Sequence, residues 1–329
     1  MGWTLLLFLL GFVLLYKGGD VFVDSAVNLA RHFGISEVLI GATIVSIGTT
    51  IPETMVSALA SASGTSDIAY GNALGSIICN TAFIAGLLLV LMPVTVKRKD
   101  IKLGMGFFFC AGIVFFQIAF LNGGVSRGAG IGLILIAVCY MLLNISGAKR
   151  AESERMQSAG VNDEPLPVTL LTLIFSAAIL FAGSNLLINN GIILARQLKI
   201  PEQVIGLTFI ALGTSLPELV TAITAISKGH GDVSLGNIIG ANFLNLTVVI
   251  GLSSAINSIQ IAKDQLITDC LIAGLVMLIL TVPVFIKGHT RRRYGVLLLG
   301  IYILYCIYLF SGSIQANTVD VFAPYVINY

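Results

Sequence analysis

The second half of the chain repeats the polar residues and glycines of the first half at a constant offset of 165 residues. The stretch GTTIPE at 48–53 returns as GTSLPE at 213–218, and GNALGSIICN at 71–80 returns as GNIIGANFLN at 236–245. Outside these motifs the same offset pairs Gly18 with Gly183. A gap-free offset of this length indicates two copies of one structural unit, so any fold of the chain must accommodate a repeat.

Each copy contains five apolar segments near the length of about 20 residues that spans a bilayer as a helix. They lie at 3–30, 37–62, 67–93, 101–121, 128–147, 166–195, 202–227, 232–257, 265–286 and 294–311. Only 10% of the residues are charged, against about 25% in soluble domains. Because five is odd, the second copy enters the membrane upside down. We predict an all-α integral membrane protein of ten transmembrane helices, built as two inverted five-helix repeats with broken helices 2, 3, 7 and 8.

Polar segments set the predicted boundaries: a first repeat at 1–147, a cytoplasmic linker at 148–165, a second repeat at 166–312 and a short external tail at 313–329. With the N-terminus outside, the cytoplasmic loops hold 13 Lys and Arg residues and the external loops hold 4. This bias favours a multi-pass protein of the plasma (inner) membrane with both termini outside. The N-terminal segment lacks a basic region and a cleavage site, so it is predicted to be a transmembrane helix rather than a signal peptide.

A proline and a glutamate lie inside the second apolar segment of each copy. Pro52 has no N–H, so the carbonyl of Gly48 loses its helical partner, and in lipid that carbonyl must be satisfied by protein, water or an ion. Thr49 and Thr50 precede Glu53 by four and three residues, so their hydroxyls converge with the carboxylate on one side of the break. The second copy repeats the arrangement with Thr214, Ser215 and Glu218.

Amide and hydroxyl side chains recur every fourth residue in the next segment of the first copy, at Asn72, Ser76 and Asn80. The matching positions of the second copy are Asn237, Ala241 and Asn245. The paired positions offer carboxylates and neutral oxygens but no histidine or thiolate, which favours a hard cation such as Ca²⁺ or Na⁺.

Each of these residues also has a purely structural interpretation. A proline in a membrane helix is usually a kink, a threonine usually bonds to its own helix, and the asparagines Asn72 and Asn237 could simply hold helices together. An intramembrane glutamate is different, because its charge costs a few kcal/mol and indicates function. Near the segment ends, Asp67 and Asp232 are predicted helix N-caps, and Lys17, Asp20 and Asp24 are predicted to form a loose charge cluster.

The paired motifs resemble the two alpha repeats of the sodium/calcium exchanger family of prokaryotic type, within the calcium/cation antiporter superfamily. The resemblance covers nearly the whole chain. It implies a secondary antiporter that exchanges Na⁺ for Ca²⁺ by alternating access, with spans one and six sliding across the other eight. It implies no enzyme activity, no cofactor, no nucleic acid and no obligate protein partner; Ca²⁺ and Na⁺ are substrates and the lipid bilayer is the surroundings. The metal-site residues that it implies are Glu53, Glu218, Thr49, Thr50, Thr214, Ser215, Ser76, Asn80 and Asn245, with backbone carbonyls at Ser46 and Ala211.

Two positions depart from the best-known members of that family. Asn245 stands where an aspartate is common, and Ala241 stands where a serine is common, which leaves the number of sodium sites open. The missing aspartate argues against a K⁺-dependent exchanger. The proton/calcium branch typically reads GNAxE where this chain reads GTxxPE, but an H⁺/Ca²⁺ antiporter stays an alternative because a glutamate pair can bind protons. An intramembrane enzyme with Glu53 as base lacks a recognisable nucleophile or metal motif, and the sequence alone does not distinguish a channel.

Overall fold

The computed structural model describes residues 2–155, 165–198 and 213–315 of the 329-residue chain. The described part is helical apart from one pair of two-residue strands. Its first part contains α1 (Gly2–His32), α2 (Glu37–Ile40), the π-helix η1 (Gly41–Val45), α3 (Ser46–Thr49), α4 (Ile51–Ala62), α5 (Ser66–Ile78), the π-helix η2 (Cys79–Ala85), α6 (Gly86–Leu91), α7 (Arg98–Asn122), β1 (Gly124–Val125) and α8 (Arg127–Arg155). The rest contains α9 (Leu166–Gln197), α11 (Leu216–Ser227), α12 (Gly231–Leu244), the π-helix η4 (Asn245–Val249), α13 (Ile250–Ile256), β2 (Ile259–Gln260), α14 (Lys263–Lys287) and α15 (Arg292–Gln315).

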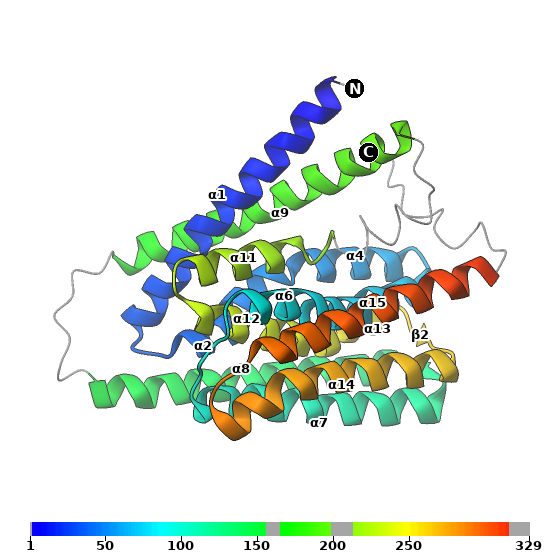
Figure 1. The fold of residues 1–329 in the computed structure, drawn as a ribbon. Coiled ribbons are helices and arrows are strands. Elements are labelled where there is room, and N and C mark those ends of the chain that lie inside the picture. The colour runs from blue at the N-terminus through cyan, green and yellow to red at the C-terminus, as the bar shows by residue number, and fades with distance from the viewer. Residues whose placement is uncertain (1, 156–164, 199–212, 316–329) are drawn as a thin grey trace.

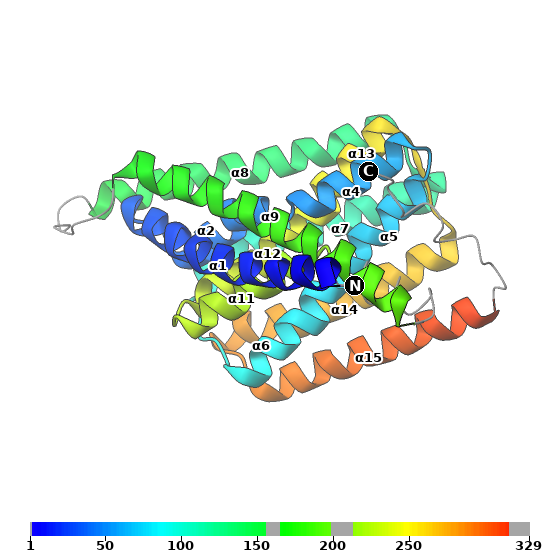
Figure 2. The same ribbon diagram turned by 90° about the horizontal axis from the view of Figure 1, so that it is seen from above.

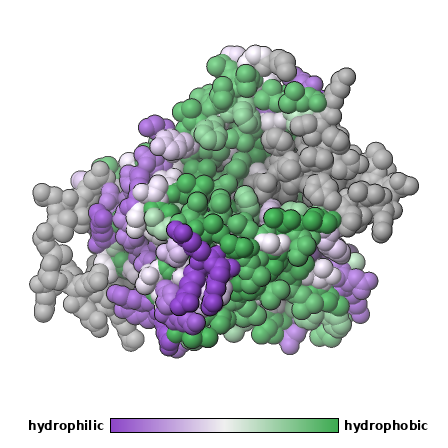
Figure 3. Space-filling view, in the orientation of Figure 1, coloured by the Kyte–Doolittle hydropathy of each residue, from purple (hydrophilic) through white to green (hydrophobic). Residues whose placement is uncertain are grey.

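Among the described residues, eight helices are long and apolar enough to cross a membrane, or nine if the bent pair from Glu37 to Ala62 is one span. The predicted all-α membrane architecture is therefore confirmed at this level. The predicted seventh span is represented by α11 alone, because the residues before it, 199–212, lie outside the described part. Figure 3 shows apolar residues over the middle of one face and hydrophilic residues toward the helix ends.

The break in the second span falls where the sequence predicts it. The helix axis bends by 43° between Thr49 and Ile51, and Pro52 lies in the first turn of α4, where a missing N–H needs no helical partner. Pro217 has the same place in α11. The third and eighth spans differ from the prediction, because 68–91 and 231–256 are each continuous. They contain instead the π-helices η2 and η4, a distortion that is frequent at functional sites.

Helix ends explain two further boundaries. Both α7 and α14 end against a glycine in the left-handed conformation, Gly123 (φ 69°) and Gly288 (φ 72°), a conformation that glycine adopts without strain. In contrast, α8 continues to Arg155, well into the predicted linker. The segment ISGAKRAESER there is rich in Ala, Lys, Arg and Glu, which are strong helix formers, so the helix extends beyond its apolar part.

The pair α1 and α9 forms a layer of its own, inclined across the other helices (Figures 1 and 2). The two backbones come very close, because a Cβ built on Gly11 would lie 2.7 Å from the Leu187 amide nitrogen and one on Gly183 would lie 2.8 Å from that of Leu15. Only glycine permits this approach. A separate apolar cluster that includes Phe22 packs this pair against the other helices.

The remaining helices enclose a second, larger apolar cluster. At its centre α12 packs against α2, η1 and α3. A Cβ on Gly236 would lie 2.2 Å from the Val38 carbonyl oxygen, and one on Gly240 would lie 2.6 Å from that of Ala42. The small residues of the second copy thus allow backbone contact between helices, as small-xxx-small faces do. The first-copy counterpart of α12 is α5. The residues expected to pack against α5 in the same way, 203–211, lie outside the described part.

Candidate cation site

Two glutamates lie in matching places, Glu53 in the first turn of α4 and Glu218 in the first turn of α11. Both are 0% exposed. None of their four carboxylate oxygens has a hydrogen-bond partner among the described residues. The two carboxylates are close enough to interact electrostatically. Two buried acids without a basic partner require a cation or a proton to balance them.

Neutral oxygens around these acids are also unpaired. Thr50 and Ser215 immediately precede α4 and α11, and both hydroxyls are buried without a partner among the described residues. The same holds for the Ser76 hydroxyl and for the side-chain amides of Asn80 and Asn245, which lie at or near the two π-helices. The supporting elements pack crosswise, α4 against η4 and α11 against η2. Buried polar atoms normally have partners, so this cluster is chemically incomplete without a ligand.

The predicted hydroxyls Thr49 and Thr214 are paired, and each is paired across the two copies. Thr49 donates to the Asn237 amide oxygen at 3.1 Å, and Thr214 donates to that of Asn72 at 3.3 Å. The offset of 165 residues converts one bond into the other. Asn72 also donates to Ser57 at 2.9 Å, and Asn237 donates to Thr221 at 3.3 Å. In this structure both asparagines therefore join helices, and each positions a threonine of the opposite copy.

Of the two residues predicted to bind through their backbone carbonyls, only Ser46 lies in the described part of the chain. Ser46 is fully buried; its carbonyl accepts the Thr50 N–H at 3.0 Å, and a carbonyl has a second lone pair for a further ligand. Ala211 lies outside the described residues. Ala241 is 0% exposed and brings no polar side-chain atom where the first copy has Ser76.

Cys79 is a neighbour of the site that the sequence pattern did not reveal. It is buried at the start of η2 and lies close enough to both glutamates to interact with them electrostatically. Its counterpart in the second copy is Leu244, so the repeat gives no signal for it. Only its place directly before Asn80 could have suggested a role.

The charged residues near the helix ends are arranged differently from the prediction. Lys228, at the end of α11, binds Asp20 at 2.5 Å and Asp24 at 2.8 Å, and also donates to the Asp20 carbonyl at 3.0 Å. The cluster is therefore an ion pair between α1 and α11, and Lys17 instead lies 5.8 Å from the Tyr16 ring centroid.

The two predicted N-caps are wrong. His230 is the N-cap residue of α12, and Asp232 lies in its first turn. Thr65 is the N-cap residue of α5, which already includes Asp67. A negative charge is still favourable in the first turn because it faces the positive end of the helix dipole, so the position is one that suits an acid.

Within the described residues, no group of three or more His, Cys, Asp or Glu side chains could hold a metal ion. The candidate site therefore has two carboxylates, and neutral oxygens supply the remaining ligands. Such a set suits Ca²⁺ or Na⁺ rather than zinc or copper, which favour nitrogen and sulfur.

Comparisons with known proteins agree with this chemistry. The family model of the sodium/calcium exchanger protein matches the chain twice, over residues 3–146 and 168–311. The chain is 36% identical to inner membrane protein YrbG of Escherichia coli, over 92% of this chain and 96% of that protein. It is 32% identical to sodium/calcium exchanger MaX1 of Methanosarcina acetivorans, over 93% and 98%.

A solved structure of the sodium-calcium exchanger NCX_Mj, soaked without Na⁺ and Ca²⁺, superimposes with a TM-score of 0.77. The two chains are 30% identical, and the match covers 93% of this chain and 98% of the other. Membership in a family of transporters confirms the prediction that the chain is not an enzyme. The chain belongs to the sodium/calcium exchanger protein family.

Proposed function

We propose that this protein exchanges Na⁺ for Ca²⁺ across the membrane by alternating access, with Glu53 and Glu218 as the charged ligands near the membrane midplane. One observation carries the proposal: two fully buried carboxylates interact with each other, and no oxygen of either has a hydrogen-bond partner among the described residues. Two relatives, MaX1 and NCX_Mj, are described as sodium/calcium exchangers, which supports the choice of ions.

The charge balance accounts for obligatory exchange. Two bare carboxylates repel each other in a low-dielectric site, and moving them unpaired across the membrane barrier is costly. One Ca²⁺ balances both charges, and so do two Na⁺. Either load permits the conformational switch, whereas the empty site does not, so transport of one ion must be followed by return of the other.

The neutral ligands favour Ca²⁺ over Mg²⁺. Calcium accepts six to eight oxygen ligands in a flexible shell, whereas Mg²⁺ demands a tight octahedron and gives up its waters reluctantly. Hydroxyl and amide carbonyl oxygens are available from several elements, at Thr50, Ser215, Ser76, Asn80 and Asn245. In our proposal these complete the shell, and the Ser46 carbonyl, with that of Ala211, contributes from the backbone.

We further propose ten transmembrane helices in two inverted five-helix repeats. The reciprocal bonds Thr49–Asn237 and Thr214–Asn72 support a two-fold relation between the copies, and the family model matches the two halves separately. The pair α1 and α9, with its own apolar cluster and glycine contact, is suited to slide as one body across the other helices. From the distribution of Lys and Arg, both termini lie outside the plasma membrane.

Calcium uptake by purified protein in proteoliposomes tests the ion assignment. Vesicles loaded with Na⁺ and diluted into Na⁺-free medium should accumulate ⁴⁵Ca²⁺, and vesicles loaded with K⁺ or with acidic buffer should not. Uptake driven by a proton gradient at constant Na⁺ would identify an H⁺/Ca²⁺ antiporter. Uptake that requires K⁺ together with Na⁺ would identify a K⁺-dependent exchanger, and uptake without any counter-ion would identify a channel.

A further inference from the structure

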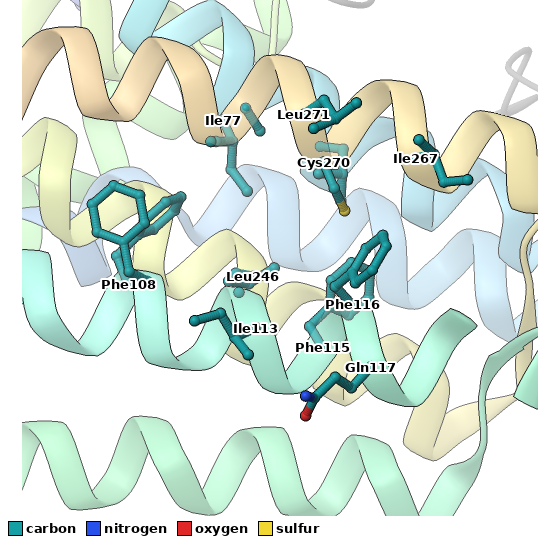
Figure 4. A pocket seen from close by; sticks show the side chains of 15 residues that line it. Ile77, Phe108, Ile113, Phe115, Phe116, Gln117, Leu246, Ile267, Cys270 and Leu271 are labelled. Atoms are coloured by element: carbon teal, nitrogen blue, oxygen red, sulfur yellow. The ribbon is translucent and has the colours of Figure 1, made fainter. Parts of the chain in front are cut away.

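A cavity in the membrane-facing wall contains none of the candidate cation ligands in its lining. It has a volume of about 450 Å³, within the ~300–1,000 Å³ range that is usual for small-molecule sites. It lies between α7 and α14, and α5 and η4 form its inner wall. Figure 4 shows Phe108 and Phe116 of α7 on either side of the space, Cys270 of α14 pointing toward α7, and Leu246 of η4 behind them.

The composition of this cavity identifies its occupant as apolar. Gln117 and the thiol of Cys270 are the polar groups of its lining, and the other lining residues are apolar. Two of them, Ile113 and Leu271, are 59% and 67% exposed. In a chain that spans a membrane, exposed apolar side chains face lipid tails, and so few polar groups do not hold water in an apolar cavity.

The cavity and the first turn of α14 together match the depth of one leaflet. From Lys263, the first residue of α14, to Gly274, which lines the cavity, there are eleven residues, or about 16 Å at 1.5 Å per residue. Half of a typical hydrocarbon core is about 15 Å. The cavity itself is lined on α14 from Ile267 to Gly274, about 10 Å, and the first turn of α14 connects it to Lys263. The cavity and this turn together extend from one membrane surface to about the middle of the bilayer, which is the reach of a single acyl chain.

A basic residue stands at the surface end of the groove. Lys263 is exposed, and its Nζ lies 5.1 Å from the ring centroid of Phe120. Phe120 stacks on Phe116 with centroids 5.6 Å apart, and Phe116 lines the cavity. A continuous path of side chains thus connects the ammonium group to the cavity. A lysine near the membrane surface attracts anionic headgroups.

We propose that this groove binds an anionic phospholipid, with one acyl chain between α7 and α14 and the phosphate beside Lys263. The bound chain contacts the back of the ion site: Leu246 follows Asn245, and Ile77 follows Ser76. A side chain added at Gly274 would meet nothing within 4 Å, so the missing side chain leaves room for the tail. The site depends on the membrane location of the chain and not on which cations are exchanged.

Photo-crosslinking tests the site in vesicles that contain the full-length protein. The probe is phosphatidylglycerol with a diazirine at the end of one acyl chain, and peptide mapping locates the adducts. We expect adducts concentrated on the lining residues of α7 and α14. Gly274→Phe should lower them at least fivefold. The matched control is Gly300→Phe on α15, where an added side chain also meets nothing within 4 Å, and it should leave them unchanged.

The headgroup contact has its own test. Lys263→Gln should lower labelling at least threefold with the phosphatidylglycerol probe and leave labelling unchanged with a phosphatidylcholine probe. The adjacent Asp264 is also exposed, so Asp264→Asn should raise labelling by phosphatidylglycerol. Equal labelling of the wild type by both probes would overturn the anionic assignment.

Gly274→Phe could lose labelling because it fails to fold, so a second measurement leaves the groove unfilled. The experiment measures the rate at which a lipid-soluble maleimide labels Cys270, in a protein whose other exposed or half-buried cysteines, Cys110, Cys139 and Cys306, are replaced by serine. Phosphatidylglycerol should slow this reaction at least threefold relative to phosphatidylcholine. Adducts spread evenly over α15 and the groove, or a Cys270 rate independent of lipid, would overturn the proposal.

Discussion

The two copies of the repeat match at the candidate cation site but differ at the ends of their helices. At the site, Glu53 corresponds to Glu218, and each has an unpaired hydroxyl three residues before it, Thr50 or Ser215. At the end of α11, Lys228 binds Asp20 and Asp24 of α1. The corresponding positions of the other copy are the neutral residues Ser63, Asn185 and Asn189.

This contrast separates two physical tasks. Charges inside a low-dielectric site must be balanced by the ion load, so both copies need their carboxylate and neither can lose it cheaply. Charges at the helix ends are partly solvated and each contributes little. This ion pair joins the two copies, and the mirror positions are neutral. An ion pair without a symmetric counterpart can therefore bias an otherwise two-fold transporter toward one side without blocking transport.

The largest effect is expected from the carboxylates. Glu53→Gln and Glu218→Gln should each lower Na⁺-driven Ca²⁺ uptake at least 100-fold, because each removes half of the charge that a Ca²⁺ ion needs. Thermal unfolding without Ca²⁺ should be unchanged or occur at higher temperature, since an unpaired buried charge is destabilising. A large difference between the two variants would contradict the equivalence of the copies at the site.

Asn245 provides a sharper test of how much negative charge the site holds. Wild-type exchange should be unaffected when external K⁺ is replaced by choline, because one Ca²⁺ balances two carboxylates. Asn245→Asp adds a third ionisable group beside two acids, so exchange should become dependent on K⁺, on pH, or on both. Both proteins are compared in one vesicle assay at constant Na⁺. Strong activation of the wild type by K⁺ would instead place the protein with the K⁺-dependent exchangers.

The one unmatched hydroxyl should have an intermediate effect. Ser76→Ala should weaken apparent Ca²⁺ affinity by about threefold to tenfold, since a single neutral polar contact contributes about 0.5–1.5 kcal/mol. Its mirror, Ala241→Ser, adds a hydroxyl at a fully buried position and should change Na⁺ dependence more than Ca²⁺ affinity. Initial rates over a range of both ions measure this. No change in Ser76→Ala would remove that residue from the site.

The smallest effect is expected at the ion pair. Lys228→Gln should alter the ratio of apparent Ca²⁺ affinities from the two membrane faces by about twofold to fivefold, since exposed ion pairs contribute about 0.2–1 kcal/mol. The mirrored pair, Ser63→Lys with Asn185→Asp and Asn189→Asp, should shift the ratio in the opposite direction. The ratio is measured in vesicles of known protein orientation. If both variants shift the ratio in the same direction, the ion pair does not set the bias between the two membrane faces.

The same ion pair has a defined pH dependence. Partial burial alone would lower the pKa of Lys228, but hydrogen bonds and attraction from Asp20 and Asp24 raise it above its ordinary value. The ammonium charge of Lys228 is therefore fully present below the ordinary lysine pKa of about 10.4 and is lost only as pH rises through the higher value. The effect of Lys228→Gln should accordingly be constant between about pH 6 and 9; a change in that range would exclude the charged contact as its cause.

Much of the architecture was predictable because lipid restricts a chain to few solutions. Apolar length predicted the eight long helices that the described residues contain, and Pro52 predicted the bend, since a missing N–H interrupts a helix in any surroundings. Continuity of the third and eighth spans was not predictable. The spans contain π-helices that begin at Cys79 and Asn245, and the residue pattern did not predict them.

For the candidate site, the sequence alone determined which side chains offer carboxylate and neutral oxygens. A glutamate inside the membrane costs free energy, so its repetition in both copies indicates a function rather than a structural role. Tertiary structure decided which of these groups are free to bind an ion. Thr49 and Thr214 are bonded across the copies, whereas Thr50 and Ser215 are not. It also brought Cys79 to the carboxylates and Lys228 to Asp20. These contacts join residues far apart in the chain, and their free energy depends on distances that only the packed helices set.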